Sequence, residues 1–173
     1  MLDVIRLFIL MIVFAVAGRV AGREIPPFKL PEGTVKVVAV VYDYEADELS
    51  RAAVVMDGKP HRGIIRKFNK VLPEAEVAAL ADALTEKHAR RNRFLCDFAP
   101  HHGFIFYDKA DAIVGSVSVC FSCADIKSPN FQGEKDLFYS YWDWQALRGI
   151  LERNGVPIFR HAARYTELWK EQG

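Results

Sequence analysis

The sequence predicts an α+β fold: one antiparallel sheet built from two hairpins, with helices packed on one face. Two observations support this prediction. Pairs of segments with alternating apolar residues are each followed by segments with the apolar spacing of helices. The expected order is strand, strand, helix, strand, strand, helix, helix, which is typical of α+β domains, because a parallel sheet needs a long crossover between neighbouring strands.

Residues 1–22 are predicted to form a signal peptide. Arg6 precedes an unbroken apolar run from Leu7 to Ala17, and small residues suited to a cleavage site follow. The run is shorter than the roughly 20 residues that a membrane span requires. An uncleaved N-terminal anchor is the alternative interpretation. We therefore expect a single α+β domain over 23–173 that is exported, periplasmic or secreted, with no membrane contact beyond the export segment.

The composition excludes several classes of protein. The chain has 23 basic and 22 acidic residues, so its formal net charge is +1 at pH 7. A near-neutral chain does not have the charge of a general nucleic-acid binder. Hydrophobic residues make up 51% of the chain, which argues against disorder and for a packed core.

The first half of the domain contains the first hairpin and a helix. Thr34–Tyr44 is predicted to be a central strand because both of its faces are largely apolar. Ser50–Met56 is predicted to be the second strand, followed by a turn at Asp57-Gly58. The segment His61–Lys70 is basic and shows no clear period. Leu72–His88 has an apolar stripe at helical spacing and an acidic first turn, so a helix is expected there.

The second hairpin has the clearest pattern in the chain. Gly103–Asp108 and Ala112–Phe121 alternate apolar residues with period two, and a short polar connection joins them. This alternation places Ile113 on the same face as Val117. The expected register pairs Phe106 with Ile113, Phe104 with Gly115 and His102 with Val117, and its extension brings Cys96 opposite Cys123.

The remaining residues are predicted to form a loop and two helices. Residues 124–139 have the composition of a long loop, which often has a function. Asp143 is a good N-cap for a helix that ends at Asn154-Gly155. A last helix is expected over Arg160–Glu171.

All three cysteines lie between 96 and 123, at the open end of the second hairpin. Export favours oxidation, so a disulfide is expected between Cys96 and either Cys123 or Cys120, with one thiol left over. A dithiol redox site at Cys120 and Cys123 is a further alternative, although no strand–helix–strand pattern surrounds the pair.

A metal site is the main alternative to the disulfide. Three cysteines and a histidine form a ligand set that suits zinc, and fewer of them would suit copper. A buried histidine bonded to the backbone is, however, commoner than a histidine ligand. The candidate ligands are Cys96, His101, His102, Cys120 and Cys123.

Aromatic residues near the end of the predicted loop are the candidates for binding a partner. Exposed aromatic and apolar surface would mark a recognition site for a protein or a small molecule. Burial against the core is the alternative explanation for these side chains. The candidates are Phe131, Phe138, Tyr139, Tyr141 and Trp142.

The segment Leu72–Phe159 resembles a group of small uncharacterised bacterial exported proteins. The resemblance rests on a motif similar to C…P-x-H-G…F-Y-D…CF-x-C. It implies a shared fold and a shared site, and it implies no activity. The residues that match the motif are Cys96, Pro100, His102, Phe106, Tyr107, Asp108, Cys120, Phe121 and Cys123.

The sequence contains no motif that points to catalysis. It has no nucleophile elbow, zinc-protease helix, phosphate-binding glycine loop or dinucleotide fingerprint. An exported binding or interaction domain is therefore the first hypothesis, with a disulfide stapling the hairpin. A zinc, copper or thiol-redox protein is the second, and an enzyme is the third.

Overall fold

The computed structural model describes residues 28–47, 53–85, 90–91, 97–129, 139–140 and 142–172, with backbone alone for 90–91 and 139–140. The strands are β1 (Lys36–Val41), β2 (Val55–Met56), β3 (Lys59–Pro60), β4 (Lys70–Val71), β5 (Arg90–Arg91), β6 (His102–Tyr107), β7 (Ile113–Cys120), β8 (Asp125–Lys127) and β9 (Tyr139–Ser140). The α-helices are α2 (Glu74–Ala83), α3 (Trp144–Arg153) and α4 (Ala163–Lys170), and two 3₁₀ turns are η1 (Tyr44–Ala46) and η2 (Arg66–Phe68).

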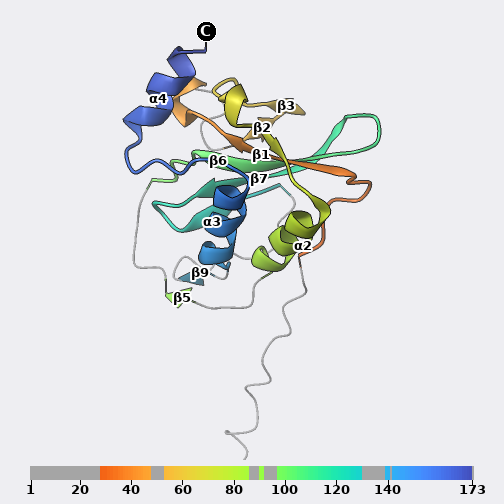
Figure 1. Cartoon of the computed structure of the whole chain (residues 1–173). Coiled ribbons are helices and arrows are strands. Elements are labelled where there is room, and N and C mark those ends of the chain that lie inside the picture. Colours follow the sequence, from red (N-terminus) through yellow and green to blue (C-terminus); the bar gives the residue numbers. More distant parts are fainter. Residues whose placement is uncertain are drawn as a thin grey trace, which may run out of the picture.

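Five strands form the main antiparallel sheet, in the order β4-β1-β6-β7-β8 (Figure 1). The predicted α+β fold is confirmed. β1 lies inside the sheet, as its apolar faces predicted, and pairs with β4 and β6. The strand expected over Ser50–Met56 is shorter in the described part of the chain. Only Val55–Met56 is a strand there, and it pairs with β3 in a separate hairpin.

One face of the main sheet, which we call the inner face, is covered by helices. Figure 1 shows α2 and α3 together below the sheet and α4 near one end of it. The odd-numbered β1 residues and the even-numbered β6 residues point to this side and are almost fully buried against the helices. The largest of them are Phe104 and Phe106, and the helices contribute Leu80, Leu147, Ile150, Leu151 and Leu168.

The opposite, outer face carries a smaller cluster that is covered by the β2–β3 hairpin (Figure 1). This hairpin turns at Asp57-Gly58, as the sequence predicted, with φ angles of 50° and 70°. Two positive φ values are the requirement of the tight hairpin turn that matches strand twist. Val54, which precedes β2, donates its backbone N–H to Ser118 Oγ at 2.8 Å and so attaches the hairpin to β7.

The predicted register of the β6–β7 hairpin was wrong by two residues. Phe104 lies opposite Val117, and Phe106 lies opposite Gly115. A bulge beyond Phe106 inserts one extra residue, so that Ile113 pairs with Tyr107 and packs in the outer cluster. The sequence had placed Ile113 on the inner face with Val117. A two-residue shift preserves the faces of all other positions, which is why the rest of the pattern was read correctly.

The elements after Cys120 differ in part from the predicted long loop. Its first residues, Asp125–Lys127, form β8, which pairs with the end of β7. The helix after Asp143 is confirmed, because the Asp143 carboxylate accepts the backbone N–H groups of Gln145 and Ala146. α2 and α4 both start later and end earlier than predicted, at the bounds given above.

Candidate functional site

The turn after β7 separates Cys120 from Cys123. Cys120 ends β7 on the outer face as a buried free thiol, and it donates to the Ala99 carbonyl at 3.3 Å. Cys123 lies in the four-residue turn that leads to β8 and is not a free thiol. Its Sγ is 3.0 Å from the carbonyl oxygen of Asp97. Cys96 lies outside the described residues. Its chain neighbour Asp97 is described and lies beside Cys123.

His102 is a structural core residue. It lies opposite Val119, not opposite Val117 as predicted, and its Nε2 donates to the Pro157 carbonyl at 2.9 Å. Burial lowers the pKa of His102 to about 4, so the ring is neutral at pH 7. Its edges meet the rings of Phe121 and Tyr165.

His101 belongs to the opposite side of the strand. Its Nδ1 donates to the Tyr42 carbonyl at 3.2 Å, and its ring stacks on Tyr165 with centroids 3.9 Å apart. Burial lowers the pKa of His101, with smaller opposing effects from the Tyr42 carbonyl and nearby carboxylates. The two adjacent histidines therefore bond to different backbone carbonyls, although both rings contact Tyr165.

The predicted metal ligands are not brought together in the part of the chain that the structure describes. No three His, Cys, Asp or Glu side chains among these residues are placed to hold a metal ion. Because Cys96 is outside these residues, the zinc or copper site stays a prediction.

Most of the predicted aromatic partner surface also lies outside the described residues. Phe131, Phe138 and Tyr141 are there, and Tyr139 is described only as backbone in β9. Trp142 is half-buried, packs against the inner core and lies 6.1 Å from the ring of Trp144.

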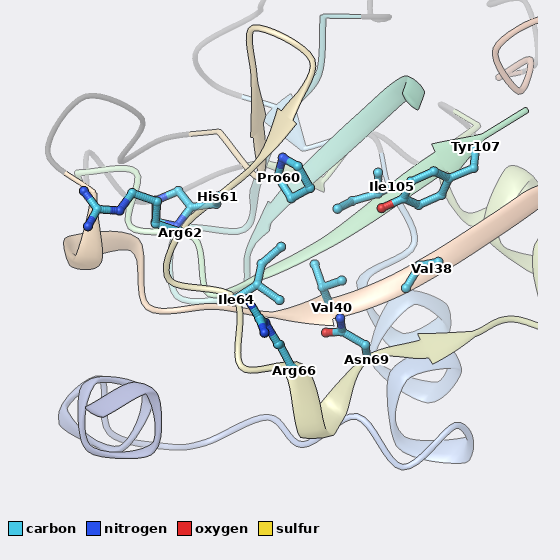
Figure 2. A pocket seen from close by; sticks show the side chains of 10 residues that line it. All are labelled: Val38, Val40, Pro60, His61, Arg62, Ile64, Arg66, Asn69, Ile105 and Tyr107. Carbon is cyan, nitrogen blue, oxygen red and sulfur yellow. The ribbon is translucent and has the colours of Figure 1, made fainter. Parts of the chain in front are cut away.

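The structure instead shows a cavity of about 430 Å³ on the outer face of the sheet (Figure 2). Its floor consists of Val38 and Val40 of β1 with Ile105 of β6. Val38 faces Ile105 directly across the two strands. Tyr107 continues the floor toward the hairpin end. The other lining residues all come from one segment, 60–69: Pro60, His61, Arg62, Ile64, Arg66 and Asn69.

An interruption of the edge strand shapes this segment. Ile64 bridges to Tyr42 of the β1 extension, and Lys70 pairs with Ala39. Between these two pairs the wall segment is six residues long, whereas the facing part of β1 and its extension is only three residues long. The 3₁₀ turn η2 accommodates the additional residues. At the start of the detour, Gly63 passes so close to β1 that an added Cβ would lie 2.1 Å from the Asp43 carbonyl oxygen. Only glycine fits this approach.

The end of α4 holds the same segment through its backbone. Trp169 Nε1 donates to the Arg62 carbonyl at 3.3 Å. The Gln172 side chain donates to the Ile64 carbonyl at 2.6 Å and accepts the Arg66 N–H at 2.9 Å. The backbone of the cavity wall is therefore fixed from outside, while the side chains of Arg62 and Arg66 are exposed at its rim, with the Arg62 guanidinium extending away from Val38 and Ile105 (Figure 2).

The electrostatics of this cavity are one-sided. No acidic residue lines it, and none of the ion pairs between described residues involves Arg62 or Arg66. His61 is only 3% exposed, and its Nδ1 accepts the Gly63 N–H at 3.0 Å. Burial lowers the pKa of His61, so the ring is neutral with its proton on Nε2. Asp47, Asp43 and the Tyr44 backbone oppose this lowering of the pKa, and no described group lies in good hydrogen-bond geometry to Nε2.

A second cavity, of about 440 Å³, lies between η1 and α4 and has the opposite charge balance. Asp43, Glu45 and Glu167 line it, against the single cation Lys170. His101 forms part of its wall. This cavity and the first one share no lining residue.

Sequence reasoning missed the cavity on the outer face. The available signal was the basic run from Lys59 to Lys70, which contains no acidic residue. The part from His61 to Lys70 shows no clear period, and its position over an apolar sheet depends on long-range pairing.

No protein-family model, curated protein or solved structure matches the chain. None of the helices in the described ranges is long and apolar enough to cross a membrane.

Proposed function

We propose that the protein is a small exported binding domain that holds an apolar ligand group on the outer face of its sheet. The observation that carries this proposal is the cavity over Val38, Val40 and Ile105. Its volume lies within the roughly 300–1,000 Å³ that is usual for ligand pockets. An apolar floor bounded by a few polar side chains is also the usual composition of such pockets.

The rigidity of the wall supports a preformed binding site rather than a chance gap in the packing. The floor is a strand pair whose inner side is packed against the helical core. The wall segment is tied to α4 by the three hydrogen bonds of Trp169 and Gln172. A site that is already ordered without its ligand loses little conformational entropy on binding, which favours affinity.

We also propose a Cys96–Cys123 disulfide that staples the open end of the β6–β7 hairpin. Cys120 is a free thiol, Cys123 is not free, and the Cys123 sulfur lies beside the carbonyl group of Asp97. With three cysteines in the chain, Cys96 is then the available partner. The proposed export to an oxidising compartment agrees with this pairing.

Filling the cavity tests the binding proposal. We expect Val38→Trp to abolish the fluorescence gain of a neutral solvatochromic dye, because the new ring would occupy the floor. Val71→Trp is the matched control: Val71 pairs with Val38 on the neighbouring strand, is 63% exposed and does not line the cavity. Absence of dye binding to the unmodified protein, or equal binding by both variants, would contradict the proposal.

Export is tested separately on the protein recovered from outside the cytoplasm. Cleavage after the small residues that follow the apolar run should leave a mature N-terminus near Gly18 or Arg23. Mass spectrometry that finds Met1 intact on the exported protein would contradict it.

A further inference from the structure

We propose that the ligand of the outer-face cavity is a soluble amphiphile with one anionic head group, such as a carboxylate. This inference rests on the proposed binding function and specifies its ligand. The apolar body would lie against the half-buried Val38 and Tyr107, above Val40 and Ile105, which are only 1% exposed. The head group would lie at Arg62, Arg66 and His61.

The charge of the lining determines the sign of the head group. Both arginines line the cavity and are free of the ion pairs formed between described residues, and the lining contains no carboxylate. The Lys59–Lys70 segment that supplies the wall adds only positive charge to the field. A cationic head group would meet repulsion there, and an anion would gain charge-assisted hydrogen bonds.

His61 supplies an independent indication of an acceptor oxygen. A buried polar group without a partner is destabilising and therefore calls for an explanation. His61 is 3% exposed, its Nδ1 is used by Gly63, and its Nε2 is unsatisfied among the described residues. An anionic oxygen at the cavity wall would accept this N–H, against some repulsion from Asp43 and Asp47, whose carboxylates act on the same ring. A neutral hydrocarbon would leave it unpaired.

The floor determines the rest of the ligand. Val38, Val40 and Ile105 offer no hydrogen bond, and the polar groups beside them are the Tyr107 hydroxyl, which points toward Ile105, and the Asn69 amide (Figure 2). A fully hydrated anion such as phosphate would gain nothing from this surface. An alkyl or aromatic body that leaves water for the floor gains free energy in proportion to its buried area.

The test compares ligands of one length that differ in the head group: decanoate, methyl decanoate and decylammonium, each below its micelle concentration. Displacement of the neutral dye and calorimetry give the affinities. We expect decanoate to bind at least about tenfold more tightly than the other two, with an affinity that falls as salt is added. Equal binding of the neutral ester would overturn the head-group inference while leaving the cavity function intact.

Charge variants locate the head group. Arg62→Gln with Arg66→Gln should weaken decanoate about tenfold or more and weaken the neutral dye much less. Lys67→Gln is the matched control, since Lys67 lies on the same segment, pairs with Glu171 at 3.6 Å and does not line the cavity. An equal loss in the control would show a general field effect and overturn the assignment.

Two further outcomes separate the alternatives. Binding to anionic vesicles without binding of monomeric decanoate would show a membrane-surface protein and overturn the proposal of a soluble ligand. Failure of both the dye and decanoate to bind would overturn the proposed function itself.

Discussion

The two faces of the main sheet differ in how completely they are buried. On the inner side of β1, Val37, Ala39 and Val41 are at most 1% exposed beneath three helices. On the outer side, Val40 is equally buried, but Val38 is half-buried and its partner Val71 is 63% exposed. The same strand therefore completes a core on one side and leaves a partly uncovered floor on the other. The contrast indicates that stability resides mainly on the inner face, and it agrees with the proposal that the outer face binds a ligand.

The largest expected effect comes from breaking the inner face. Phe106→Ala should lower the free energy of unfolding by about 3–5 kcal/mol, because it removes a fully buried ring and leaves a cavity. Tyr107→Ala is the matched change on the next residue, where the side chain is half-buried on the outer face. Urea unfolding should show less than half the loss there. Equal losses would mean that the faces contribute equally.

The proposed staple is expected to have the next largest effect. Cys123→Ser should cost about 3–4 kcal/mol if it opens the 96–123 loop, whereas Cys120→Ser should cost much less. Denaturant unfolding without reductant measures both. A thiol count on the unfolded protein should give one free thiol and no stoichiometric zinc or copper. Three free thiols with bound metal would replace the disulfide by the metal site.

Acid should destabilise the inner face through His102. Burial lowers its folded-state pKa to about 4, and His101 and Arg148 add a smaller effect of the same sign. In the unfolded chain this histidine has a pKa near 6.5, so between pH 4 and 6.5 the unfolded state binds more protons than the folded state. The free energy of unfolding therefore falls as the pH drops from about 6.5 to 4, and the loss levels off below pH 4.

The maximum loss from this group is about 3 kcal/mol. His102→Gln keeps a donor for Pro157 and removes the titration, so its melting temperature should depend less on pH in this window. Exposed His161→Gln is the control and should retain the slope of the unmodified protein. An unchanged slope in His102→Gln would assign the acid effect to other groups.

The smallest effect is expected at the exposed edge of the outer face. Val71→Thr should change the free energy of unfolding by no more than about 0.5 kcal/mol, because the side chain is mostly in water already. Thermal unfolding provides the measurement. A loss of several kcal/mol would show that this edge is covered in solution by another chain.

Local sequence patterns predicted the fold where each element depends on neighbours close in the chain. The alternation of β1, the Asp57-Gly58 turn and the Asp143 N-cap were all read correctly. The register of β6 and β7 was not, because a bulge of one residue has no marker in the apolar pattern around Val114. The pairing of β1 with β6 joins segments about 65 residues apart, as in Val38 with Ile105, and periodicity contains no information on it.

The outer-face cavity was not predicted, for the same reason. Adjacent histidines suggested a joint ligand set, yet neighbours on a strand point to opposite faces, and His101 and His102 bond to different carbonyls. His61 and Arg62 had no motif to distinguish them. Their importance depends on the apolar floor contributed by β1 and β6, which only the folded chain brings beneath them.

The wall of the outer-face cavity is one continuous stretch, 60–69, which starts in the β2–β3 hairpin, pairs with the β1 extension at Ile64 and is bonded to the chain end at Trp169 and Gln172. Its exposed side chains, such as Arg62 and Arg66, can therefore change without disturbing the buried positions Gly63 and Ile65. Related chains would be expected to share Val38, Val40 and Ile105 as a common apolar base while these exposed wall residues differ. In protein engineering, the exposed positions of this stretch can be substituted to change ligand preference. Exchanging Arg62 and Arg66 for acidic residues should make the cavity prefer amines.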